Sequence, residues 1–381
     1  MKIPFNKPFM SGMETEYIRQ AVAEGHISGN GEFTKRCQHF FEERYGFRKC
    51  LLTTSCTDAL EMAALLTGVG PGDEVIVPSY TFVSSALAFV RTGATIVFAD
   101  SRSDQPNIDE NSLEALITPR TKVIVPVHYA GCACAMDAIM AVAERHNLIV
   151  VEDAAQAIDS FYTGNDGNKR ALGSIGHLAA FSFHETKNII SGEGGLLVVN
   201  DERFVGRAEI LWEKGTNRAE FFRGEVNKYG WVDIGSSFLP TEMVSAFLWA
   251  QLENLEVIQN RRKVIWNNYH KQLAPIAAAG RATLPVIPAG ATNNAHMFYL
   301  LFPNLEKRSG YIAKMKERGI ACPFHYLPLH TSDFICKHQK CGSRPLPNCD
   351  RYADCLVRLP LFYELDPQPV IDATLEILDA R

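Results

Sequence analysis

The chain has 381 residues, a formal net charge of −5 at pH 7 and 46% hydrophobic residues. This size and composition allow a large buried core, and the lack of a Lys/Arg surplus argues against a nucleic-acid partner. The amino terminus has no apolar signal region, and no uncharged apolar stretch approaches the roughly 20 residues that cross a bilayer, so we expect a cytoplasmic protein without a membrane partner.

From about residue 51 to residue 200, short β-branched runs alternate with helical periodicity. This alternation predicts an α/β fold, in which helices cover both faces of a mostly parallel sheet. The expected strands span residues 50–54, 74–77, 95–98, 122–127, 148–151, 178–183 and 195–199. The expected helices span residues 57–66, 82–91, 111–117 and 135–146.

The pattern changes after Pro240. A long amphipathic helix is expected from residue 241 to about residue 273. Short runs then follow at residues 297–302, 311–318, 321–326 and 370–379, and they suggest a small α+β unit. We therefore divide the chain into a large α/β domain (1–240), a connecting helix (241–275) and a smaller C-terminal α+β domain (276–381).

The ten cysteines do not indicate a disulfide framework, because cysteines in a chain of this size without an export signal are usually reduced. A polar loop near the carboxyl end contains Cys336, His338 and Cys341, and Cys349 follows. Their spacing lacks the regular pairs of a zinc site, so we expect reduced surface thiols and no metal.

The strongest functional signal is an aspartate and a lysine that each follow a predicted buried strand. Asp153 follows the run 148–151, and Lys187 follows the run 178–183. Ligands of open α/β sheets gather at the carboxyl ends of the strands. An amine that forms a Schiff base and a carboxylate that keeps a pyridine nitrogen protonated are the groups that pyridoxal 5′-phosphate (PLP) requires. The pair predicts a PLP enzyme.

Other side chains near these strand ends have two interpretations each. Cys56 and Thr57 open a predicted helix, where free N–H groups and the helix dipole favour a phosphate, although an ordinary N-cap is the simpler interpretation. Ser182 is either a phosphate ligand or a serine tolerated in a strand. Gln156 can offer its amide to a ring hydroxyl. His184 either lines the site or belongs to the core.

These residues stand in a series of motifs that resembles the DegT-type family of PLP-dependent sugar-nucleotide aminotransferases over nearly the full length. The motifs are Cys56–Leu60, Pro78–Phe82, Val127–Gly131, Glu152–Gln156, Ser182–Lys187, Gly192–Gly195, His325–His330 and Leu359–Leu361. The resemblance implies the fold-type-I aminotransferase architecture, with a mostly parallel seven-stranded sheet and a smaller C-terminal α+β domain.

The resemblance also implies a role for each candidate residue. Lys187 would be the Schiff-base lysine, and Asp153 would hold the pyridinium, with Gln156 beside it at the ring oxygen. Phe82 would stack on the ring. The phosphate would be bound by the amides of Cys56 and Thr57 and by the hydroxyl of Ser182.

One position departs from the family pattern. Many members place an asparagine of the partner subunit, within an Asn-Tyr-Arg run, on the phosphate. This chain has Ser237-Phe238-Leu239 there. The shorter Ser237 is therefore a candidate phosphate contact, with a water between the two groups if it is needed.

The activity implied by the resemblance is transfer of the amino group of L-glutamate to the 4-keto carbon of a dTDP-linked keto-deoxy sugar, in a homodimer with shared active sites. A 3-aminotransferase acting on a dTDP-3-keto-6-deoxy sugar remains an alternative, as does a PLP-binding regulatory protein without turnover. Lys187 argues against a related dehydratase, which carries histidine at that position. Arg218, Asn217 and Lys228 are candidate contacts of the nucleotide or of the glutamate carboxylates.

Overall fold

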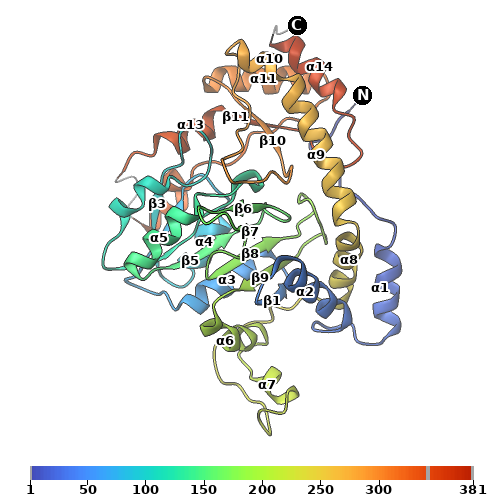
Figure 1. Ribbon diagram of the computed structural model, residues 1–381, viewed down its shortest axis with the longest axis vertical. Helices are drawn as coiled ribbons and strands as arrows, with labels where there is room; N and C mark the ends of the chain where they lie inside the picture. Colours follow the sequence, from blue (N-terminus) through green and yellow to red (C-terminus); the bar gives the residue numbers. More distant parts are fainter. Residues whose placement is uncertain (1, 340–343, 379–381) are drawn as a thin grey trace.

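Seven strands form the central sheet of the computed structural model, which describes residues 2–339 and 344–378 (Figure 1). The strands are β1 (Lys49–Thr53), β2 (Glu74–Pro78), β3 (Thr95–Ala99), β4 (Thr121–Ile124), β5 (Ile149–Asp153), β8 (Leu178–Ser182) and β9 (Gly195–Val199). Their spatial order is β1-β9-β8-β5-β4-β2-β3, and β9 runs antiparallel to the other six. The predicted α/β class and mostly parallel seven-stranded sheet are therefore confirmed.

Helices cover both faces of this sheet because neighbouring residues of a strand point to opposite sides. In β1, for example, Leu51 and Leu52 are both buried but belong to different apolar clusters. One face carries α3 (Cys56–Thr67), α4 (Ser84–Val90) and α6 (Glu202–Trp212). The other face carries α2 (Glu32–Tyr45), α5 (Met136–His146) and α8 (Glu242–Glu253).

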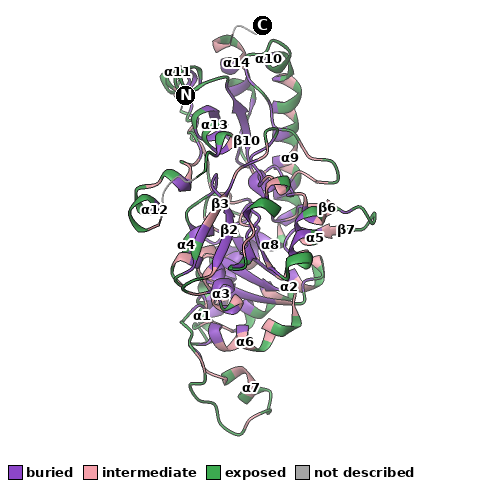
Figure 2. Cartoon of the chain, turned by 90° about the vertical axis from the view of Figure 1, so that its left-hand side faces the viewer, coloured by how far each residue is buried: buried purple, intermediate pink, exposed green. Residues whose placement is uncertain are grey.

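Smaller elements surround this core. Helix α1 (Glu14–Ala23) packs against α8, and β6 (Phe161–Thr163) pairs with β7 (Lys169–Ala171) in a short hairpin. The short helix α7 (Arg218–Phe222) belongs to a segment of residues 213–237 that projects from the sheet, and we call this segment the arm (Figure 1). Figure 2 shows that most of the arm is exposed.

A further apolar cluster lies away from the sheet and is formed by the elements that follow α8 together with Ile3. Strands β10 (Phe298–Leu301) and β11 (Leu356–Leu359) form an antiparallel pair there. The helices of this region are α9 (Leu255–Gln272), α10 (Ala274–Ala278), α11 (Leu305–Glu317), α12 (Asp333–His338), α13 (Pro347–Cys355) and α14 (Gln368–Ile377). The proposed division of the chain at residues 240 and 275 remains a prediction.

Two expected elements differ from the observed ones. The helix expected over 241–273 is divided into α8 and α9 at Asn254, whose side chain donates to the Ala250 carbonyl oxygen at 2.9 Å and competes with the regular helix. The helix expected over 111–117 is instead two single 3₁₀ turns, η1 (Glu110–Ser112) and η2 (Glu114–Leu116), because Pro119 follows too closely for the helix to continue. Two further 3₁₀ turns are η3 (Tyr129–Gly131) and η4 (Leu329–Thr331).

The expectation of reduced cysteines is wrong for Cys336, which is disulfide-bonded. Chain length and compartment predict only an average redox state, whereas a bond depends on which two sulfurs meet. Cys341 lies outside the described residues. Within the described residues no group of three metal-ligating side chains comes together, and no helix of these residues combines the length and the apolar character of a membrane span.

Candidate active site

The carboxyl edge of the sheet borders a cavity of about 590 Å³. Segments that follow β1, β2, β5 and β8 form one side of the cavity, because the ends of parallel strands meet at the same edge. Residues from α9, β11 and the loop before β10 form the opposite side, together with the amino-terminal Phe5 and Asn6. Segments that are distant in the sequence therefore share this space.

Seven of the eight predicted site residues line this cavity: Cys56, Thr57, Phe82, Asp153, Gln156, Ser182 and Lys187. Ser237 does not line it. It is exposed and lies in the arm, where it forms an isolated bridge with Glu213. A single chain therefore brings seven of the predicted residues together and leaves Ser237 outside.

The amino end of α3 offers unused N–H groups to the cavity. Ser55 is the N-cap, and its hydroxyl accepts a hydrogen bond from the N–H of Asp58 at 3.1 Å. The N–H groups of Cys56 and Thr57 precede that position and have no acceptor within the helix. Gly195 of β9 lies directly beneath, because a Cβ added there would stand 2.5 Å from the nitrogen of Cys56. This end of the helix is therefore closely packed and presents free N–H groups that suit an anion.

Asp153 is held by two hydrogen bonds at the end of β5. Its Oδ2 accepts from the Ser85 hydroxyl at 2.6 Å, and its Oδ1 accepts from the N–H of Ala155 at 3.1 Å. Ser85 also contacts the Thr81 hydroxyl at 2.9 Å. Because Asp153 is only 6% exposed, its carboxylate has one fixed orientation at the cavity wall.

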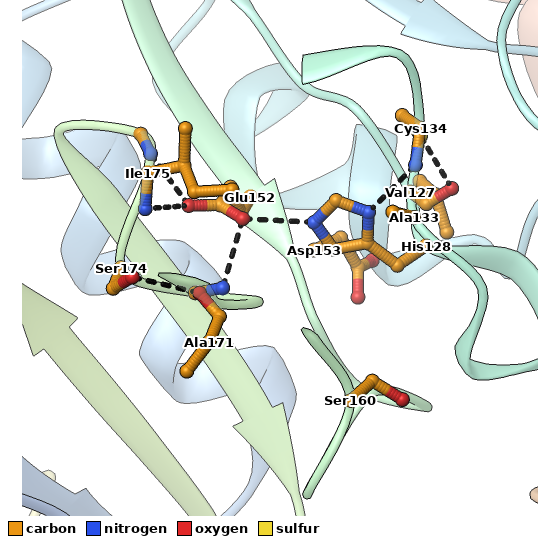
Figure 3. A network of polar contacts seen from close by, with 12 residues as sticks. Val127, His128, Ala133, Cys134, Glu152, Asp153, Ser160, Ala171, Ser174 and Ile175 are labelled. Atoms are coloured by element: carbon orange, nitrogen blue, oxygen red, sulfur yellow. Dashed lines mark hydrogen bonds and ion pairs between the residues drawn. The ribbon is translucent and has the colours of Figure 1, made fainter. Parts of the chain in front are cut away.

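Behind Asp153, a buried pair of charged groups fixes the backbone of β5 (Figure 3). Glu152 Oε2 lies 2.8 Å from Nε2 of His128, and neither side chain is exposed to solvent. Since the N–H of Cys134 donates to Nδ1 of His128 at 3.2 Å, the ring hydrogen is on Nε2 and points to Glu152. The N–H of His128 also donates to the carbonyl oxygen of Asp153 at 3.1 Å.

Glu152 accepts three further hydrogen bonds, from the N–H groups of Gly173, Ile175 and Gly176. Burial works to raise the pKa of Glu152, but the hydrogen bonds from His128, Gly176 and Gly173 outweigh it and the pKa is lowered. The ionised carboxylate is thus the form that the fold requires.

Replacing Glu152 with glutamine should lower the free energy of unfolding by about 3 kcal/mol at neutral pH, because an NH₂ group would face at least one N–H donor. Since the pKa is lowered from 4.5, the contribution of Glu152 is fully present above pH 4.5 and is lost as the pH falls through the folded-state value. Urea unfolding measures the difference. The exposed Glu144→Gln on α5 should change stability by less than about 0.5 kcal/mol. Equal stability of the two variants would contradict this account.

Lys187 lies in the loop that joins β8 to β9. Burial lowers its pKa, while Cys56 and Asp153 act in the opposite direction. The next residue, Asn188, is buried and donates to Gln259 Oε1 at 2.7 Å and to the Asn294 carbonyl oxygen at 2.9 Å. The backbone at Lys187 is thereby anchored to α9 and to the loop before β10.

Sequence reasoning missed several residues of the opposite wall. They are Arg262, His296, His325, Tyr326 and Arg358. His325 and Tyr326 stood within one of the motifs but were given no role of their own. Arg358, an arginine inside the apolar run of β11, was a further signal. Burial lowers the pKa of His296 and of His325 well below the ordinary value, so both are neutral.

The candidates Arg218, Asn217 and Lys228 lie in the arm and do not line the cavity.

These features fit PLP. Unpaired N–H groups at the start of α3 suit a phosphate, a fixed buried carboxylate suits a pyridinium nitrogen, and a lysine of lowered pKa suits an aldehyde. All three groups line the same cavity. Gln156 lies nearby, with its Oε1 accepting from the N–H of Ala130 at 2.7 Å and its Nε2 donating to the Tyr326 hydroxyl at 3.1 Å.

Comparison with known proteins identifies the family. Residues 9–375 match the DegT/DnrJ/EryC1/StrS aminotransferase family. The spore coat polysaccharide biosynthesis protein SpsC of Bacillus subtilis is 33% identical, over 99% of this chain and 97% of its own length. The GDP-perosamine synthase of Caulobacter vibrioides is 35% identical, over 86% and 85% of the two chains.

A solved structure agrees with these sequences. The sugar aminotransferase Spr1654 of Streptococcus pneumoniae superimposes with a TM-score of 0.89 over 99% of both chains, at 26% identity, and was solved in a pyridoxamine phosphate form and a PLP form. The match covers the sheet, the cavity and the elements beyond α8. This chain belongs to the DegT/DnrJ/EryC1/StrS aminotransferase family, and it is a PLP-dependent sugar aminotransferase.

Proposed function

We propose that the enzyme transfers the amino group of L-glutamate to the 4-keto carbon of dTDP-4-dehydro-6-deoxy-D-glucose, giving dTDP-4-amino-4,6-dideoxy-D-galactose and 2-oxoglutarate. The observation that carries the proposal is the joint presence of Lys187 and Asp153 in one cavity large enough for a cofactor and a substrate. The choice of sugar is supported by the segments 213–218, 233–237 and 294–298, which resemble the dTDP-4-amino-4,6-dideoxygalactose transaminase of enterobacterial common antigen synthesis. A cytoplasmic location belongs to the same proposal.

In this proposal most of the predicted cavity residues bind the cofactor, and Lys187 transfers protons. The N–H groups of Cys56 and Thr57 and the hydroxyl of Ser182 bind the phosphate, and Phe82 covers one face of the ring. Asp153 keeps the proton on the pyridine nitrogen. When bound, PLP supplies an electron sink for negative charge at the substrate carbon.

Lys187 moves the proton. Its Nζ takes a proton from the donor carbon and returns one to the cofactor side, and it repeats the transfer in reverse for the sugar. Because burial lowers its pKa, a larger fraction of Lys187 is the neutral amine that this transfer needs. The side from which Nζ approaches the sugar carbon sets the galacto configuration of the product.

The experiment that tests the substrate assignment is an incubation of the PLP-loaded enzyme with L-glutamate and the 4-keto sugar nucleotide. NMR of the product should show the new amine at carbon 4 with an axial orientation. A 3-amino product, formed from a dTDP-3-keto-6-deoxy sugar, would instead establish the alternative. Loss of the visible band of bound PLP on adding L-glutamate separates both enzymes from a regulatory protein that binds PLP without turnover.

A homodimer with shared active sites is part of the same proposal. The arm exposes several large apolar side chains, including Phe222 at 70% and Trp231 at 82%. Phe82 is 56% exposed at the cavity, and Val83 beside it is 49% exposed. Large apolar side chains exposed to this extent are typical of surfaces that a partner covers. A second copy would cover them and could bring the Ser237 hydroxyl to its neighbour's phosphate.

We expect the double substitution Phe222→Ser and Trp231→Ser to shift the enzyme from dimer to monomer, because both side chains are exposed in one chain and would be buried between two. Size-exclusion chromatography with light scattering measures the mass. Leu305→Ser, at an exposed apolar residue of α11, should leave the dimer intact. A wild-type protein with the mass of one chain would contradict the dimer.

A further inference from the structure

Arg358 is a cation on the wall of the cavity, and most of its hydrogen-bond donors are unused. It lies in β11, and its guanidinium stands 4.4 Å from the centre of the Phe5 ring. Its Nη2 donates to the Phe324 carbonyl oxygen at 3.1 Å, whereas its Nε is buried and has no partner among the described residues. A guanidinium carries five N–H donors, so several donors of Arg358 remain for a ligand.

No carboxylate compensates the charge of Arg358. Its side chain forms no ion pair within residues 2–339 and 344–378, and burial lowers its pKa although Tyr129, Tyr326 and Tyr80 act in the opposite direction. Arg262, the other arginine of this wall, differs because its Nε and Nη2 both donate to backbone carbonyl oxygens. Arg358 is half-buried, so its charge has lost part of its hydration without gaining an ionic partner, and an anionic ligand relieves that cost.

We propose that Arg358 binds a carboxylate of the amino-acid donor. The planar guanidinium matches the two oxygens of a carboxylate, and paired charge-assisted hydrogen bonds of this kind are strong and directional. Burial is the main cause of the lowered pKa of Lys187, and Arg358 adds to it, so the guanidinium lies within electrostatic reach of the reacting amine.

The position of the donor's charges favours a carboxylate over a diphosphate. An α-amino acid carries a carboxylate on the same carbon as the amine that is transferred, so this charge must enter the cavity beside Lys187. In a sugar nucleotide, part of the hexose ring separates the keto carbon from the diphosphate. Arg358 shares the cavity with the reacting lysine, and it therefore suits the charge that lies next to the reacting carbon.

The inference deepens the proposed function, from which it takes the amino-acid donor, L-glutamate. It does not depend on the sugar. A 3-amino product in the NMR experiment would overturn the proposed 4-amino transfer and would leave the role of Arg358 unchanged.

The first test is a binding measurement on the PLP-loaded enzyme by calorimetry. Glutarate, a dicarboxylate without an amine, is the probe, and dTDP is the comparison ligand. We expect Arg358→Gln to weaken glutarate binding by about tenfold or more and to leave dTDP binding unchanged. Glutarate would lose its charge-assisted hydrogen bonds to the guanidinium, whereas dTDP makes none with it. Unchanged glutarate affinity, weakened dTDP affinity, or no glutarate binding by the wild-type enzyme would overturn the proposal.

The matched control is Arg308→Gln. Arg308 is likewise an arginine without an ion pair in the described parts of the chain, it is buried, and it lies 5.5 Å from the centre of the Phe324 ring, but it does not line the cavity. The Arg308→Gln variant should bind glutarate as tightly as the wild type does. If Arg358→Gln does not fold, Arg358→Lys serves instead, because lysine keeps the positive charge but lacks the planar guanidinium that pairs with both carboxylate oxygens. The Arg358→Lys variant should bind glutarate less tightly than the wild type and should bind dTDP with unchanged affinity.

A second test identifies which carboxylate is held. Single-turnover loss of the visible band of bound PLP is followed with L-glutamate and with L-glutamine, which differ only at the distal group. Arg358→Gln should slow both donors equally if it binds the carboxylate beside the amine, and should abolish the preference for glutamate if it binds the distal one. Unchanged rates with both donors would overturn the proposal.

Discussion

Replacing Lys187 with alanine should lower the rate of amino transfer by at least about 10³-fold, because the substitution removes both the covalent attachment of the cofactor and the group that moves the proton. Initial rates with L-glutamate and the keto sugar nucleotide measure the loss. The variant should still fold, since Asn188 keeps its hydrogen bonds to Gln259 and Asn294. It should also still bind PLP without a covalent bond, through the phosphate site at α3.

The matching covalent test uses borohydride reduction followed by peptide mapping. In the wild-type enzyme the cofactor should become fixed to the peptide that contains Lys187, and in Lys187→Ala no peptide should be labelled. The control Lys35→Ala, at an exposed residue of α2, should keep both the activity and the label. Labelling of a different lysine in the wild type would overturn the assignment of the reactive amine.

The sheet and one side of the cavity could be predicted because their signals are local. Each strand of the sheet is a short apolar run. Asp153 ends one of these strands and Lys187 lies in the loop after another, at the edge where ligands bind. The start of α3 was predictable for the same reason, since a helix that follows a strand displays its free N–H groups at that edge. These arguments use only residues that are neighbours in the chain.

The opposite side could not be predicted in this way. Arg262, His296 and Arg358 come from a helix, a loop and a strand whose approach depends on how the region beyond α8 packs against the sheet. No periodicity in the sequence records that approach. The pairing of His128 with Glu152 is another example, because both residues stood in recognised motifs while their contact arises only when β4 and β5 lie side by side.

A second large effect is expected from Asp153→Asn, which should lower kcat by about 10²- to 10⁴-fold with little change in stability. The asparagine can still accept from the N–H of Ala155 and can still contact the Ser85 hydroxyl, so the shape of the site is kept. What is lost is the negative charge that keeps the pyridine nitrogen protonated. Steady-state rates and thermal unfolding, measured side by side, separate the two effects, and Asp354→Asn at an exposed residue of α13 is the control.

A cofactor analogue methylated at the pyridine nitrogen makes this prediction sharper. Such an analogue carries a permanent positive charge and needs no carboxylate to maintain it, so it should restore part of the activity of Asp153→Asn. The same analogue should give the wild-type enzyme no gain, because Asp153 already supplies the protonated form. Failure of the analogue to raise the activity of a folded, analogue-loaded Asp153→Asn would mean that Asp153 acts by orienting its neighbours Ser85 and Ala155 rather than through its charge.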